Sequence, residues 1–186
     1  MAPEIHRLSP TLAIWHQYDP AVKAELFSTA ITTQAGVCLV DPIPLDGEAL
    51  SDLIGTGKVG AVVVTNANHE RAAAAFAADF SVPTYSAENS VPEALGLTAI
   101  PLPGAAPREI ALHCGADGGT MIVGDALIHF GSHGFSFLPA KYCTNPKLMR
   151  KSLRTLLDFS FERLLFAHGT PIMAKARERL TALLEN

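Results

Sequence analysis

The sequence is poor in cysteine, in clustered basic residues and in long apolar runs. Cys38, Cys114 and Cys143 are an odd, widely spaced set without a C-x-x-C pair, which favours reduced, mostly buried thiols over a disulfide or a zinc–cysteine site. The net charge is −4 and no long basic run occurs, which argues against a nucleic-acid surface. No apolar run approaches the roughly 18 residues needed to span a bilayer, and no secretory signal is visible. These absences predict a cytoplasmic protein that binds neither nucleic acid nor membrane.

Two common catalytic motifs are also missing. The letters of residues 55–60 match G-x-G-x-x-G, but the segment follows an expected helix and precedes an expected strand, the reverse of a dinucleotide-binding turn. No G-x-S-x-G sequence surrounds Ser132 or Ser136, so a serine hydrolase has no candidate nucleophile.

What the chain does have is enough apolar sequence for one domain covering residues 1–186. It is 48% hydrophobic, which suits a compact core, and too short for two ordinary domains. Short apolar runs bounded by turn residues predict strands at residues 11–17, 26–33, 37–41, 61–65, 84–86, 97–102, 109–113, 120–123, 126–130 and 163–167. Helices are expected at residues 46–54, 70–80 and 146–158, and from Pro171 to the C-terminus. The pattern predicts an α/β or α+β fold with strands in the middle and helices outside.

Five segments, in order, resemble the metallo-β-lactamase superfamily. Residues 36–41 resemble its early strand ending in aspartate, and residues 65–71 align with its Thr-His-x-His-x-Asp-His turn. Residues 102–112 resemble its Thr-Pro-Gly-His segment, residues 124–128 its Gly-Asp-x-Leu-Phe strand end, and residues 164–171 its last histidine–glycine turn. The resemblance covers about residues 36 to 175 and implies a four-layer αββα sandwich.

The metal ligands implied by this resemblance are only partly present. Asp125 and His168 are retained, and Glu70 replaces an aspartate. Four histidines of the family pattern are replaced, by Asn66, Asn68, Arg71 and Ala105. Zinc prefers imidazole and thiolate and also accepts carboxylate, so the position of the first zinc has lost its imidazoles. The second position keeps Glu70, Asp125 and His168.

Arg71 permits two interpretations of this altered site. A guanidinium is always charged and cannot bind a metal, so we expect it to pair with Glu70 and Asp125 as a structural cation in place of the metal. In that case no metal cofactor is needed. Alternatively, Arg71 points outward and one Zn, Mn or Fe ion binds Glu70, Asp125 and His168.

Three further histidines lie near these motifs. His69 lies within the turn at a position that usually varies, so a side chain on the rim is favoured over a replacement ligand. His129 and His133 follow Asp125 and are candidate groove residues, weighed against a glycine-rich surface loop with polar side chains. His6 and His16 fall outside every motif.

Two functions therefore remain open. One is a protein of this fold that has lost most zinc ligands, is not a standard di-zinc hydrolase, and binds a small molecule or another protein without catalysis. The other is a divergent mononuclear metal-dependent hydrolase that acts on an ester, thioester or amide. The substrate is not readable from the sequence. The apolar stripe of the C-terminal helix is equally compatible with packing on the sheet or in a homodimer.

Overall fold

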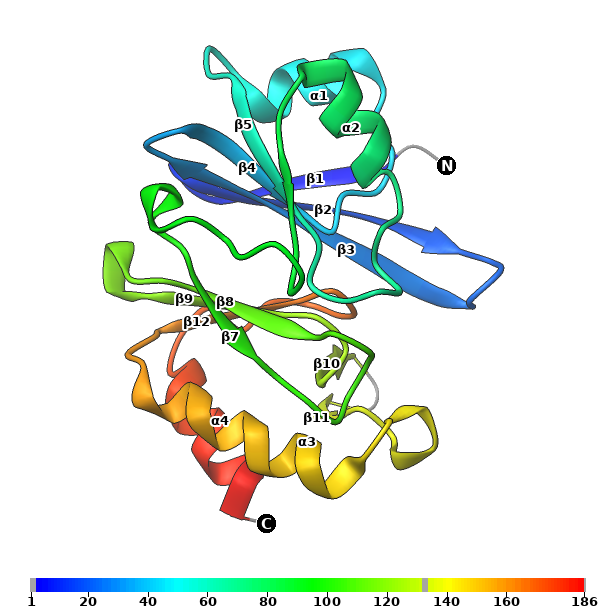
Figure 1. The fold of residues 1–186 in the computed structure, drawn as a ribbon, viewed down its shortest axis with the longest axis vertical. Coiled ribbons are helices and arrows are strands. Elements are labelled where there is room, and N and C mark those ends of the chain that lie inside the picture. The colour runs from blue at the N-terminus through cyan, green and yellow to red at the C-terminus, as the bar shows by residue number, and fades with distance from the viewer. Residues whose placement is uncertain (1–2, 132–133, 186) are drawn as a thin grey trace.

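The computed structural model describes residues 3–131 and 134–185 and has four layers (Figure 1). Two β-sheets pack face to face, with helices α1 and α2 outside the first sheet and α3 and α4 outside the second. The first sheet has six strands in the order β1-β2-β3-β4-β5-β6, and the second has four in the order β12-β9-β8-β7. The αββα sandwich predicted from the sequence is confirmed.

The six-stranded sheet is mixed. β1 to β4 pair antiparallel, whereas β5 runs parallel to both β4 and β6. Its strands are β1 (Glu4–Ser9), β2 (Leu12–Asp19), β3 (Ala24–Thr33), β4 (Gly36–Val40), β5 (Val59–Val63) and β6 (Thr84–Tyr85).

The second sheet is also mixed, because β12 runs parallel to β9 while β7, β8 and β9 pair antiparallel. Its strands are β7 (Thr98–Pro101), β8 (Ile110–Cys114), β9 (Thr120–Val123) and β12 (Arg163–Phe166). A separate hairpin is formed by β10 (Leu127–Phe130) and β11 (Gly134–Phe137).

The α-helices begin with recognisable N-terminal caps in two cases. Asp46 accepts a hydrogen bond from the backbone N–H of Ala49, and Asn145 accepts one from that of Leu148, which satisfies donors that a helix start leaves unpaired. The helices are α1 (Gly47–Ile54), α2 (Ala73–Phe80), α3 (Pro146–Leu153) and α4 (Ala176–Glu185). Short 3₁₀ turns are η1 (Glu93–Leu95), η2 (Ala116–Gly118), η3 (Ala140–Tyr142) and η4 (Arg154–Asp158).

The apolar core is divided by the two sheets into three clusters. The middle cluster lies between the sheets and includes Ile14 and Val63 from the first and Leu112 and Leu165 from the second. The outer clusters lie under the helices, as with Phe76 against the first sheet and Leu180 against the second. Burial of both faces of each sheet explains why several strands have continuous apolar sequences.

Some elements differ from the sequence-based expectation. β1 and β11 were not predicted, and the C-terminal helix begins at Ala176 rather than Pro171. The helix begins later because the backbone after Pro171 first pairs with β12. Ile172 and Leu164 exchange two hydrogen bonds of 2.9 Å in an antiparallel bridge. Similarly, α2 begins at Ala73 because the preceding residues form a turn closed by His69 N–H donating to the carbonyl of Asn66. Among the described residues, no helix is long and apolar enough to cross a membrane.

Candidate metal centre

Three strand ends meet at one edge of the sandwich and bring three candidate ligands together. Asp125 follows β9 and His168 follows β12, and these two strands are parallel neighbours in register, with Phe166 opposite Val123. The turn after β5 brings His69 to the same place. His69, Asp125 and His168 form a group whose potential ligand atoms all lie within 4.8 Å of one another.

Both imidazoles face one carboxylate oxygen. The Nε2 atoms of His69 and His168 each lie 3.2 Å from Oδ1 of Asp125. His69 is buried, with 3% of its surface exposed, and the side chains of Asp125 and His168 are exposed by 12% and 17%. The group is thus enclosed on the His69 side and reaches the surface on the side of His168.

The other ring nitrogen of each histidine is held by an acceptor. His69 Nδ1 lies 2.9 Å from Asp41 Oδ2, and His168 Nδ1 lies 3.3 Å from the backbone oxygen of Glu25. Asp41 is itself fixed, because Thr65 donates to it through its backbone N–H at 2.7 Å and its hydroxyl at 2.5 Å. A carbonyl oxygen only accepts hydrogen bonds, so Nδ1 of His168 is the donor in that contact.

The charges of the network favour an ionised His69 in the absence of metal. Burial alone lowers the pKa of His69, but the Asp41 charge and the hydrogen bonds to Asp125 and Asp41 outweigh it and raise that pKa to about 9. Burial would raise the pKa of Asp125, yet hydrogen bonds from His168 and His69 hold it well below its usual range. The pKa of Asp41 is lowered because the charge and hydrogen bond of His69 outweigh burial.

Arg71 has a different role from the one expected. Its Nη1 donates to the backbone oxygens of Phe27 at 2.7 Å and Asp41 at 3.0 Å, instead of pairing with Glu70 and Asp125. Burial lowers the pKa of Arg71, while the charges of Asp41 and Asp125 oppose that shift. Arg71 therefore fastens β3 to the end of β4, and the prediction of a bidentate salt bridge with Glu70 and Asp125 is wrong.

Glu70 is also placed differently from the prediction. Its side chain is exposed and lines a separate pocket with Ser86, Glu88 and Arg108. The turn closed between His69 and Asn66 points His69 inward, so the residue that joins Asp125 and His168 is His69 and not Glu70. The expected Glu70–Asp125–His168 ligand set is corrected accordingly.

The remaining three replaced positions, Asn66, Asn68 and Ala105, have different surroundings. Asn66 is buried, donates to Asp125 Oδ2 at 3.1 Å, and accepts from the backbone N–H of Asn68 at 2.9 Å. Asn68 is exposed and lines the groove beside the site. Ala105 is fully buried in the cluster under the outer helices of the second sheet. The side chain of Asn66 thus positions Asp125 directly.

Of the two histidines predicted to line the groove, only His129 lies among the described residues. His129 lies on β10, its Nδ1 is 2.7 Å from the backbone oxygen of Thr170, and its ring packs against Phe135 and Phe166. It is absent from the groove lining, although its neighbours Ile128 and Phe130 are present there. His133 lies outside the described residues.

A groove of about 680 Å³ opens onto His69, Asp125 and His168. Its wall contains both charged residues and apolar or aromatic ones. The other lining residues are Asp19, Val22, Lys23, Ala24, Leu26, Asn68, Arg71, Ile128, Phe130, Leu138, Pro139 and Tyr142.

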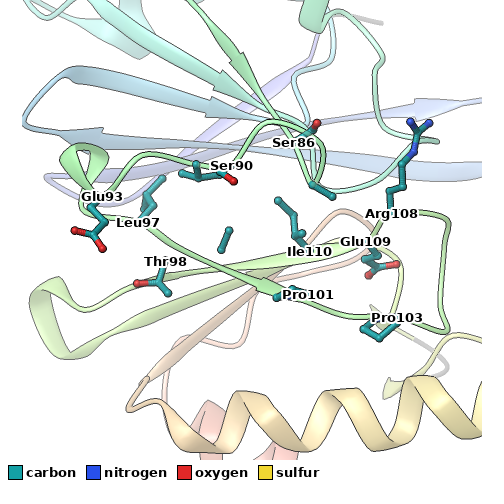
Figure 2. A pocket seen from close by; sticks show the side chains of 13 residues that line it. Ser86, Ser90, Glu93, Leu97, Thr98, Pro101, Pro103, Arg108, Glu109 and Ile110 are labelled. Atoms are coloured by element: carbon teal, nitrogen blue, oxygen red, sulfur yellow. The ribbon is translucent and has the colours of Figure 1, made fainter.

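A second cavity of about 550 Å³ shares no lining residue with this groove (Figure 2). The buried carboxylate of Glu109 lies at one end, where it accepts from the backbone N–H groups of Ala126 at 2.7 Å and Ala106 at 3.0 Å. Burial raises the pKa of Glu109 to about 7. Sequence reasoning did not single out Glu109, whose bond to Ala126 supports the turn that carries Asp125.

Comparison with known proteins establishes the fold. No protein-family model and no curated protein sequence matches the chain. The DIM-1 metallo-β-lactamase structure aligns with a TM-score of 0.77 at 12% identity, over 100% of this chain and 98% of that one. FIM-1 from Pseudomonas aeruginosa, in its mono-zinc form, gives 0.70 at 13% identity over 100% and 96%. A metallo-β-lactamase from Erythrobacter litoralis gives 0.70 at 15% identity over 98% and 92%. The chain has the metallo-β-lactamase fold over its full length, as the resemblance implied.

Proposed function

We propose that one divalent transition-metal ion binds His69, Asp125 and His168, and that the protein is a mononuclear metal-dependent hydrolase. One observation carries the proposal: both imidazoles turn Nε2 toward Asp125 Oδ1 while acceptors hold both Nδ1 atoms. Metal-binding histidines typically have this arrangement, because the second acceptor fixes the ring and its tautomer. Two imidazoles and one carboxylate with an open side form a donor set suited to zinc, manganese or iron.

The spacing of the ligand atoms also supports the proposal. Two ligands bound about 2.0–2.2 Å from a tetrahedral ion lie roughly 3.3–3.6 Å apart, slightly more than the 3.2 Å between each Nε2 and the carboxylate oxygen. Only one ion is proposed. Asn66 turns its amide donor toward Asp125, and Ala105 has no polar side chain, so these positions offer no imidazole for a second ion.

The groove suits a small substrate with an acyl group. A bound divalent ion supplies Lewis-acid polarisation of a carbonyl and a more acidic water. Leu26, Ile128, Phe130 and Leu138 form apolar surface for an acyl chain, while Lys23 provides a positive charge for a polar end. His69, held by Asp41, keeps the Asp125 carboxylate oriented. We therefore propose an ester, thioester or amide as the substrate class.

A second candidate is a metal-free binding protein. Its support is the raised pKa of His69, about 9, which makes an imidazolium between Asp41 and Asp125 the cation of the site at neutral pH. In that case the groove binds a small molecule or a protein segment without turnover.

Metal analysis of untagged protein, purified without chelator from medium containing zinc, manganese and iron, tests the proposal. We expect Asp125→Asn and His69→Gln each to contain about one equivalent less metal than the unmodified chain. Glu70→Gln is the matched control and should retain the full content, because Glu70 lines another pocket. An ester and thioester screen of the metal-loaded protein follows, with Asp125→Asn as the inactive reference. Equal metal in the unmodified chain and Asp125→Asn would contradict the proposal and favour the metal-free candidate.

A further inference from the structure

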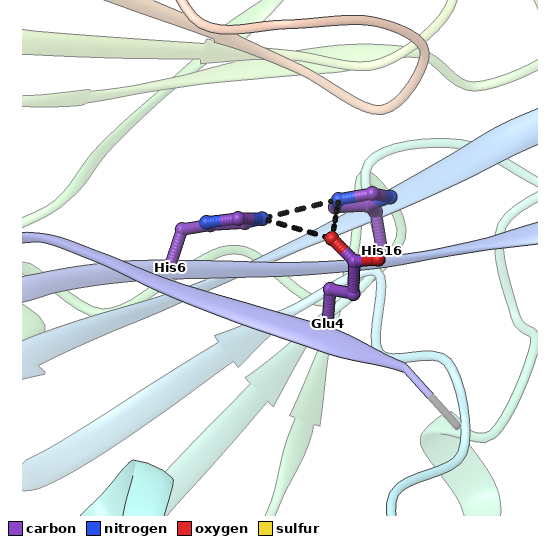
Figure 3. Close-up of side chains that lie close together, drawn as sticks. All are labelled: Glu4, His6 and His16. Carbon is purple, nitrogen blue, oxygen red and sulfur yellow. Dashed lines mark hydrogen bonds and ion pairs between the residues drawn. The ribbon is translucent and has the colours of Figure 1, made fainter.

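A second group of metal-type ligands lies on the first sheet, outside the groove. Glu4 and His6 come from β1 and His16 from β2. In the antiparallel register Glu4 lies opposite His16, and His6 is two residues further along the same face. Side chains at such directly opposed and diagonal positions reach one another. Figure 3 shows the carboxylate of Glu4 and the imidazole rings of His6 and His16 pointing toward one another.

The distance between the two imidazoles of this group matches that between ligands of one metal ion. The Nε2 atoms of His6 and His16 are 3.3 Å apart, and Glu4 Oε2 lies 3.7 Å from the first and 3.8 Å from the second. Two nitrogen ligands about 2.0–2.1 Å from a tetrahedral zinc are separated by roughly 3.3 Å. The two imidazoles are thus already at ligand spacing, and a small rotation of the exposed Glu4 completes the set.

His16 is oriented by two residues of β3 for this task. Its Nδ1 lies 3.2 Å from Glu25 Oε2, and its ring stacks on Phe27 with a centroid distance of 4.7 Å. A carboxylate on the far nitrogen of a histidine places the proton there and leaves the Nε2 lone pair free for a metal. The side chain of His16 is 22% exposed, against 50% for His6. His16 is therefore held in place before a metal binds, whereas His6 is free to adjust its rotamer.

We propose that Glu4, His6 and His16 form a surface site for a divalent transition metal of the zinc class, with Glu25 as the outer partner of His16. The donor set of two imidazoles and one carboxylate excludes a preference for calcium or magnesium, which favour all-oxygen ligands. The fourth position is open to water. Because β1 is an edge strand, a metal shared by β1 and β2 fastens that edge to the sheet.

The site is separable from the proposed hydrolase centre by mutation. The test uses zinc titration by calorimetry on untagged, zinc-free full-length chain carrying Asp125→Asn, which removes the other centre. We expect one equivalent of zinc to bind this variant and to be lost when His6→Gln or His16→Gln is added. Glu25→Gln should weaken the zinc affinity roughly 10- to 100-fold, as outer partners of histidine ligands commonly do.

Controls make the result specific. His113→Gln, on β8 and hydrogen-bonded to the backbone oxygen of Ser160, should leave zinc binding to the Asp125→Asn chain unchanged. Circular dichroism checks that each variant is folded, and Glu4→Gln provides a milder ligand change if a histidine variant is not. Zinc should also raise the Tm of the Asp125→Asn chain, and His6→Gln should remove that rise. The proposal is overturned if Asp125→Asn binds no zinc, or if its zinc persists after both histidines are replaced.

Discussion

The Nδ1 atom of His69 lies 2.9 Å from Oδ2 of Asp41, and both side chains are almost completely buried. Asp41 has a positive φ of 48° and receives two hydrogen bonds from Thr65, so its carboxylate is held in place before His69 reaches it. This pair connects the end of β4 to the turn after β5. The orientation of His69 toward Asp125 is therefore set by the fold itself.

The buried pair should make the stability of the metal-free protein depend on pH. The pKa of His69 is raised from 6.5 to about 9 in the folded state, so its contribution is complete below pH 6.5 and is lost as pH rises through 9. The pKa values of Asp41 and Asp125 are lowered from 3.8, so their contribution is present above that pH and lost as pH falls. We expect the greatest stability near pH 4 to 4.5, because the contribution of Glu109 declines above that pH, and a further loss from His69 on the order of a few kcal/mol by pH 9.

Urea unfolding in the presence of chelator, from pH 4 to 10, measures this dependence. Glu109, whose pKa is raised from 4.5 to about 7, also makes the protein less stable as pH rises, from pH 4.5 through 7 to about pH 8. The decline between about pH 8 and 9 therefore reports mainly on His69. In His69→Gln the decline from pH 8 to 9 should be largely removed, and an unchanged decline in that variant would assign the dependence to another group.

Arg71 is expected to stabilise the fold through its two backbone acceptors. Arg71→Ala leaves the carbonyl groups of Phe27 and Asp41 without their charged donor, and should lower the free energy of unfolding by about 2–4 kcal/mol. Arg108→Ala is a matched control, since both arginines have positive φ, 38° and 58°. Arg108 is exposed and pairs with Glu88, so its loss should cost about 0–1 kcal/mol.

Denaturant unfolding of the two arginine variants compares these costs directly. Because alanine meets the same left-handed backbone strain at both positions, the difference between them reports the side-chain contacts. Equal losses would mean that the hydrogen bonds of Arg71 to β3 and β4 contribute little.

Asp125 and His168 could be predicted from sequence because each lies in a segment that resembles a family motif, two residues past the end of a strand. β9 and β12 are parallel neighbours, and the carboxyl ends of such strands meet at one edge of a sheet. His69 is different, since it lies six residues beyond the end of β5. Its inward direction depends on the turn that Asn66 closes with its own backbone and side chain, and that geometry is not visible in residue spacing.

The proximity of Glu4, His6 and His16 on β1 and β2 could not be predicted from residue spacing either. His6 and His16 belong to no motif, and their proximity depends on a strand, β1, that the apolar pattern did not reveal. No residue of β1 is fully buried and its sequence is Glu-Ile-His-Arg-Leu-Ser, so it lacks the apolar run that predicts a buried strand. Cross-strand pairs become apparent only when the register is known.

Ala105 and Asn68 both stand where the family pattern has histidine, but a histidine introduced at Ala105 should cost much more stability than one at Asn68. Ala105 is fully buried among apolar side chains, so Ala105→His forces a larger polar ring into a filled core and should cost about 1–3 kcal/mol or more. Asn68 is exposed beside the groove, so Asn68→His should change stability by less than about 0.5 kcal/mol. Thermal unfolding of both variants checks the contrast. A stable Ala105→His protein would show that the cluster has room for an additional imidazole.

The absence of a side chain at Gly124 allows close packing beside the candidate centre. A Cβ there would lie 2.7 Å from Thr65 Oγ1, 2.9 Å from Asn66 Nδ2 and 3.3 Å from Glu109 Oε1, distances below normal van der Waals contact. Gly124→Ala should therefore displace the residues that hold Asp41 and Asp125, lower stability by about 1–3 kcal/mol, and weaken metal binding at His69, Asp125 and His168 at least tenfold.

Gly131→Ala is the matched control, because its Cβ would meet nothing within 4 Å. Unfolding curves and zinc titrations, performed in a His6→Gln background to remove the surface site, measure both effects. Unchanged zinc affinity in Gly124→Ala would show that the position of Asp125 does not depend on the close packing of Gly124 against Thr65 and Asn66.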